Sequence, residues 1–187
     1  MNGLSIGYRP RNIGYIWSPG PDGVAAHQTQ GVPNGLSEFE FFFSPIFNAM
    51  ALLYWWDVGS PSSAFTSIYP DDFDDDDNDN IHPLIDNGVP GLYNPGILPA
   101  YAHDVPNDWQ TFIGIESDKE TAVAIAQELN HLSESGFLGN VKKLSSLFFV
   151  CIDGFEWEMY ARDPDLIERV RAPLVRSGKY RLKDLTL

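Results

Sequence analysis

The most concentrated set of potential metal ligands is the acidic run from Asp71 to Asn80, which places seven carboxylates in ten residues. Clustered carboxylate oxygens are the ligands that Ca²⁺ prefers. In one register Asp75, Asp77 and Asp79 stand at the first, third and fifth positions of a calcium loop, and Asp86 stands at the twelfth. The twelfth position favours the longer Glu, and prolines flank the run where an EF-hand has helices. These four residues are therefore weak candidates for a calcium site, and no other cofactor is expected.

The same run is the candidate partner-binding surface. Like charges so close together repel one another and stay hydrated, so the run is not expected in a core. A solvated loop and a patch that binds a basic partner both fit this composition. The carboxylates concerned are Asp71, Asp72, Asp74, Asp75, Asp76, Asp77 and Asp79.

Charge divides the sequence near residue 118. Residues 1–118 carry 16 acidic and two basic side chains, whereas residues 119–187 carry ten of each, so the net charge of -14 lies in the first part. A protein that binds nucleic acid needs a basic face to neutralise phosphates, so direct nucleic-acid binding is not expected. A basic protein is the partner that this charge favours.

The other residues that could do acid–base or metal chemistry are sparse. A single cysteine, Cys151, excludes a multi-thiolate zinc site, and no phosphate-binding or nucleophile-elbow motif is present. His103 beside Asp104, with Asp108 nearby, is the remaining acid–base candidate, although a histidine in a surface loop is the ordinary interpretation. No catalytic residue is assigned, and the sequence favours a protein that is not an enzyme. The four histidines are too far apart for a helical His pair: His27, His82, His103 and His131.

Glu156 and Glu158 are a second carboxylate pair. They alternate with apolar residues, so they are expected on one face of a strand. Paired carboxylates can serve a hydrolase, but the solvated face of an antiparallel sheet has the same pattern and is far commoner.

The uncharged stretch 41–56 is too short to span a membrane, which takes about 20 residues. It predicts instead a buried helix near 45–57, capped by Ser44, with Phe47, Met50 and Leu53 in the core. Trp55 and Trp56 are expected to fill the core as well. Adjacent tryptophans at a helix end cannot both point inward, so one of them is a candidate anchor for a partner beside the acidic run.

The elements that would position these residues predict one domain, 1–187, with an α+β fold. Residues 1–110 form an acidic, loop-rich, Pro/Gly-rich half, and residues 111–187 form a regular half. We expect an antiparallel sheet with helices packed on one face. The regular elements are a strand over 109–115, a helix over 117–135 ended by Gly136, a hairpin of 146–152 and 156–161, a helix over 165–172 ended by Pro173, and a strand near Tyr180 and Leu182.

These features favour an acidic, cytoplasmic binding protein that neutralises a basic partner, of the kind that bacteria use as immunity proteins against toxins or nucleases. One cysteine and no signal-peptide pattern fit the cytoplasm, and no membrane association is expected. Two alternatives remain: an enzyme or divalent-cation protein that uses the Asp-rich loop, and a structural or assembly protein. The basic residues of 169–183 pair with the acidic half or promote self-association, so a homo-oligomer also remains open.

Overall fold

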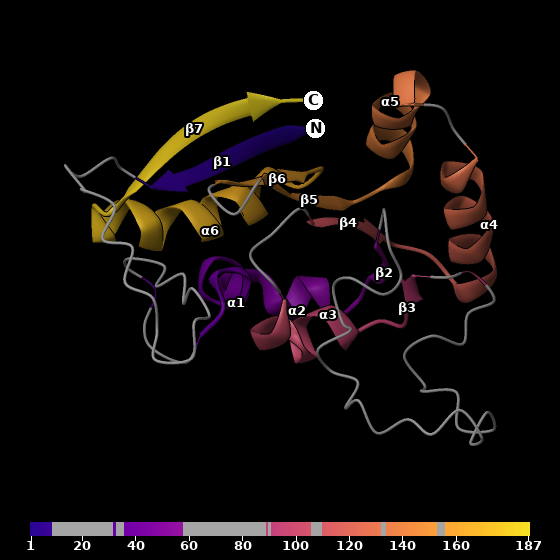
Figure 1. Cartoon of the computed structure of the whole chain (residues 1–187), viewed down its shortest axis with the longest axis horizontal. Helices are drawn as coiled ribbons and strands as arrows, with labels where there is room; N and C mark the ends of the chain where they lie inside the picture. Colours follow the sequence, from indigo (N-terminus) through magenta and orange to yellow (C-terminus); the bar gives the residue numbers. More distant parts are fainter. Residues whose placement is uncertain are drawn as a thin grey trace, which may run out of the picture.

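The part of the chain that the structure describes is centred on a seven-stranded antiparallel sheet (Figure 1). The computed structural model describes residues 1–8, 32, 36–57, 89, 91–105, 110–131, 134–152 and 156–187. Along the sheet the strands follow the order β3-β2-β4-β5-β6-β1-β7. Their bounds are β1 (Asn2–Tyr8), β2 (Tyr54–Asp57), β3 (Leu92–Tyr93), β4 (Gln110–Ile115), β5 (Leu147–Ile152), β6 (Glu156–Ala161) and β7 (Tyr180–Thr186). The α+β class and the antiparallel sheet are confirmed.

Strand β1, formed by the first residues of the sequence, pairs with its last strand, β7. It lies between β6 and β7, and its pairing with β7 runs from Asn2 opposite Thr186 to Tyr8 opposite Tyr180. The sequence did not predict this strand, because glycines at positions 3 and 7 dilute the strand pattern. The second strand of the N-terminal half, β2, pairs with β4 near the other edge.

Helices cover both faces of the sheet rather than one (Figure 1). The face that we call the α6 face packs against α1 (Glu38–Phe43), η1 (Ser44–Ile46), α2 (Phe47–Met50), α3 (Ile97–Ala100), η3 (Ala102–Asp104) and α6 (Pro164–Ser177). The other, the α4 face, packs against α4 (Lys119–Asn130) and α5 (Glu134–Leu144). Strand β4 shows why both faces are covered and not one as predicted. Phe112 is buried on the α6 face, while Ile113 and Ile115 are buried on the α4 face. A strand that is apolar on both sides needs cover on both.

The helical stretch of the N-terminal half starts and ends earlier than predicted. It begins at Ser37, whose hydroxyl accepts a 3.0 Å hydrogen bond from the Glu40 amide, and α2 ends at Met50. Ser44 and Pro45 start a 3-10 turn within it. Residues 54–57 are strand β2 instead of helix, in keeping with the strand preference of Tyr and Trp.

Two helix ends also differ from the prediction. Helix α6 continues through Pro173 to Ser177, although an interior proline costs about 3 kcal/mol, because Leu174 beyond it is buried in the core. Helix α4 is capped by Asp118, whose carboxylate accepts from the Thr121 amide at 2.8 Å. That bond lowers the pKa of Asp118. Gly136 lies inside the next helix, α5, which the sequence did not separate from α4.

Candidate functional site

The acidic run belongs to an insertion whose two ends are tied together at one edge of the sheet. The Asp57 amide at the end of β2 donates a 3.0 Å hydrogen bond to the Gly91 carbonyl, just before β3. Trp56 then pairs with Leu92 across the two strands. Residues 58–88 lie outside the described residues, and with them the candidate calcium and partner-binding carboxylates, which are Asp71, Asp72, Asp74, Asp75, Asp76, Asp77, Asp79 and Asp86. What the structure defines is their attachment, at the β3 edge.

The two tryptophans beside this attachment are both buried, so the expectation that one is exposed is wrong. Trp55 is fully buried on the α6 face, where its indole donates to the Met50 carbonyl at 3.0 Å and its ring stacks 5.6 Å from Phe149. Trp56 is 4% exposed and points to the α4 face, with its ring 6.5 Å from Phe137. Successive residues of a strand point to opposite faces, and here both faces are covered. Neither ring is accessible to a partner in this conformation.

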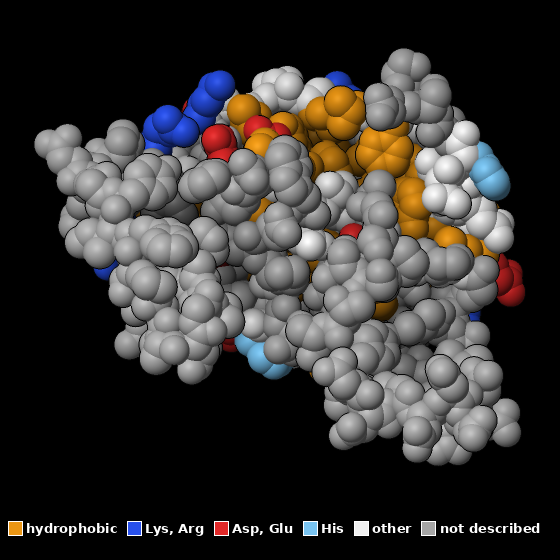
Figure 2. Space-filling model, in the orientation of Figure 1, with side chains coloured by type: hydrophobic (Ala, Val, Ile, Leu, Met, Phe, Trp, Pro, Cys, Tyr) orange, Lys and Arg blue, Asp and Glu red, His pale blue; other side chains and the backbone are white. Residues whose placement is uncertain are grey.

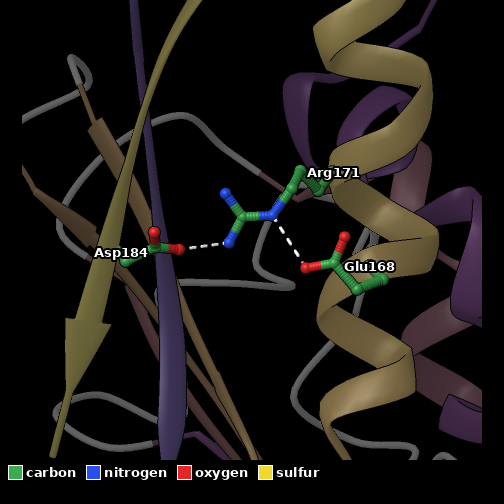
Figure 3. Close-up of polar contacts among 3 residues, drawn as sticks. All are labelled: Glu168, Arg171 and Asp184. Carbon is green, nitrogen blue, oxygen red and sulfur yellow. Dashed lines mark hydrogen bonds and ion pairs between the residues drawn. The ribbon is translucent and has the colours of Figure 1, made fainter.

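Basic side chains gather at the opposite edge of the sheet, on α6 and β7. Arg171 donates to Glu168 at 3.0 Å and to the Asp184 carboxylate of β7, so it links the helix to the edge strand (Figure 3). With neighbouring residues of β1 and β7 these three side chains line an open groove of about 250 Å³. Arg169 donates to the Pro45 carbonyl at 2.5 Å.

The remaining cations of this edge point to solvent. Arg176, Lys179 and Lys183 are exposed and have no ion-pair partner within the described part of the chain. Arg181 has only a 3.7 Å contact with Glu156 and is 61% exposed. The carboxylates that pair with this basic edge therefore come from the C-terminal half, as far as the structure describes it, and not from the acidic half.

A polar cluster on the α4 face of β6 and β1 brings together groups that the sequence left apart. Glu156 and Glu158 share this face, as predicted. The Ser5 hydroxyl donates to Glu156, and the Tyr160 hydroxyl donates to Glu158 at 2.7 Å. Arg181 of β7 approaches Glu156 from the other side of β1.

Glycines in β1 make room for this cluster. A Cβ on Gly3 would lie 2.5 Å from the Tyr160 ring, and one on Gly7 would lie 3.2 Å from the Arg181 guanidinium. The α4 side of β1 thus carries only Gly3, Ser5 and Gly7, and longer side chains from both neighbouring strands extend over it. This small-residue alternation was the signal in the sequence that could have identified both β1 and the cluster.

The chemistry of the cluster is structural. Ser5 is 2% exposed, so its hydroxyl is out of reach of a substrate. Burial and the neighbouring Glu158 raise the pKa of Tyr160 well above its usual value, which keeps the phenol protonated as a hydrogen-bond donor. The Ser5–Glu156 hydrogen bond joins β1 to β6, and the 3.7 Å ion pair between Arg181 and Glu156 joins β7 to β6.

The other candidate residues are not brought together. His103 lies exposed in η3, with its ring 6.5 Å from that of Tyr101, and His131 is exposed at the end of α4. Cys151 is buried in β5. In the described ranges no group of three or more His, Cys, Asp or Glu side chains could hold a metal ion. The sites at His27, His82 and Asp108 fall outside those ranges.

No protein-family model, curated protein or solved structure matches the chain. No helix of the described residues has the length and apolar character needed to cross a membrane.

Proposed function

We propose that this protein is an acidic binding protein that neutralises a basic protein partner, in the manner of a bacterial immunity protein acting on a toxin or nuclease. The observation that carries the proposal is the division of charge, with the whole net charge of -14 in residues 1–118. A cytoplasmic location is part of the same proposal.

The attachment points of the charged segments support it. The acidic insertion leaves the sheet at the β3 edge, and the exposed cations stand at the β7 edge. Neighbouring strands lie about 4.8 Å apart, so the six steps from β3 to β7 amount to roughly 29 Å. This distance between the two attachment points exceeds the Debye length of about 8 Å at physiological ionic strength, beyond which interactions between exposed charges are largely screened.

A molecule built in this way attracts a basic partner toward one edge and repels it from the other. Electrostatic steering of this kind raises association rates by about 10- to 1,000-fold and weakens as salt is added. The expected signature is an association rate that depends strongly on salt and on the acidic run, with a smaller effect on dissociation.

The test is surface-binding kinetics against the product of a basic open reading frame adjacent to the gene. The test variant changes Asp71, Asp72, Asp74, Asp75, Asp76, Asp77 and Asp79 to Asn, and the control changes the exposed Glu120 and Glu128 of α4 to Gln. We expect the test variant to slow association at least about tenfold at low salt, and the control to have little effect. An association rate indifferent to both salt and the Asp substitutions would overturn the proposal.

A further inference from the structure

Among the described residues, β7 is the last strand on its side of the sheet, and its pairing is regular. It pairs with β1 over seven consecutive residue pairs without a bulge. Within the described part of the chain, no strand lies on its outer side. Such an edge presents unpaired backbone donors and acceptors, and proteins commonly shield one by shortening, bulging or covering it.

The side chains along this edge differ between its two faces. On the α4 face β7 carries the exposed Arg181 and Lys183, and Lys and Arg side chains project from the β7 side of the molecule in Figure 2. On the α6 face it carries the half-buried Leu182 and the exposed Asp184, and Val175 of α6 is 60% exposed. Val175 is on the same stripe of the helix as Arg171, which reaches β7 through Asp184.

We propose that the outer edge of β7 is a docking site for an extended acidic segment of another protein, in which carboxylates alternate with apolar side chains. The segment adds to the sheet as a further strand. Because strand side chains alternate between faces, its carboxylates meet Arg181 and Lys183 while its apolar side chains meet Leu182 and Val175. Backbone hydrogen bonds hold the segment, and the alternation gives specificity.

Charge selects this occupant over a second copy of the same strand. Two β7 edges placed side by side bring Arg181 and Lys183 of each copy close to the same residues of the other. Like charges that face one another across strands are destabilising, whereas opposite charges are favourable. The same two cations therefore discourage self-pairing and attract a carboxylate-bearing strand.

The test is a fluorescence-anisotropy titration of the full chain with a labelled peptide in which Glu and Val alternate. The control is a peptide of the same composition with its Glu residues in one block, which tests whether the alternation of Glu and Val is required. Lys183→Glu is the test variant, and Lys143→Glu on α5 is the control, since both side chains are exposed and the change in net charge is equal. We expect Lys183→Glu to weaken binding about tenfold and Lys143→Glu to change it less than about twofold.

Amide hydrogen exchange provides a second measurement that does not depend on charge. Binding should slow exchange of the outward amides of β7, and Val175→Asp should weaken binding without altering the circular-dichroism spectrum. Equal affinity for the alternating and block peptides, equal losses in the two Lys variants, or unchanged exchange in β7 would each overturn the proposal.

Discussion

The guanidinium of Arg181 on β7 lies across Gly7 of β1 and comes within 3.7 Å of the Glu156 carboxylate on β6. Two strands that are not neighbours are thus joined over a third, because the strand between them has no side chain at that point. The Tyr160 ring uses the space above Gly3 in the same way. The two glycines differ in what fills the space, and this difference can be measured.

Gly3→Ala should destabilise the protein more than Gly7→Ala. The new Cβ at position 3 lies 2.5 Å from the buried Tyr160 ring, which cannot move freely, so overpacking should cost about 1–3 kcal/mol. At position 7 the obstacle is the mobile end of Arg181, and the cost should stay within about 1 kcal/mol. Urea unfolding of both variants compares the two losses.

Gly139→Ala is the control for these substitutions. Gly139 lies in α5 with nothing within 4 Å of the added Cβ, so the change should stabilise the protein by about 0.5–1 kcal/mol through helix propensity. Equal losses at positions 3 and 7 would show that the contacts over β1 do not decide the effect.

The free energy of unfolding should fall as the pH rises above 10. Burial, with the nearby Glu38 carboxylate, raises the pKa of Tyr180 from 10.0 to about 12, and burial with Glu158 raises the pKa of Tyr160 as well. The unfolded chain then loses these protons at a lower pH than the folded chain. The stabilisation is complete below pH 10 and is lost as the pH approaches 12, with a slope of up to about 1.4 kcal/mol per pH unit for each tyrosine.

Replacing both tyrosines by Phe should remove most of this slope, and the single variants separate their contributions. Chemical denaturation at several alkaline pH values measures it. A slope that persists in the double variant would assign the alkaline loss of stability to other groups.

Leu53→Ala should cost about 2–5 kcal/mol, because Leu53 is 6% exposed and its removal leaves a cavity beside the sheet. Three residues of this segment were predicted to lie in the core. Met50 and Leu53 are buried, and Phe47 is partly buried. The neighbouring Leu52 is 74% exposed, so Leu52→Ala is a matched control that should change stability by less than about 0.5 kcal/mol. Thermal or urea unfolding distinguishes them, and similar losses would contradict the assigned packing.

Changing Asp74, Asp75, Asp76 and Asp77 to Asn should leave the melting temperature unchanged or slightly raised in metal-free buffer. The sequence predicts that this run is solvated, so removing its like charges should relieve repulsion without loss of packing. Differential scanning fluorimetry with and without calcium checks this. A melting temperature that rises with calcium in the parent and not in the variant would favour the cation-binding alternative.

Local patterns in the sequence determined the elements whose signals lie close together. The hairpin of β5 and β6 follows from an apolar run and an alternating strand separated by a short turn sequence, and α4 follows from an acidic cap and an apolar stripe. The placement of Glu156 and Glu158 on one face follows from the same alternation. The charge division needs no structure at all, because it depends on composition alone.

Tertiary structure decided what depends on residues far apart in the chain. Strand β1 forms because β6 and β7 flank it, and Ser5 meets Glu156 only through that pairing. The two tryptophans are both buried because β2 is covered on both faces, which a helix at the same place would not allow. Pro173 is tolerated because burial of the helix beyond it outweighs the lost hydrogen bond. Each outcome comes from packing between distant segments, whose free energy exceeds the local preferences that the sequence displays.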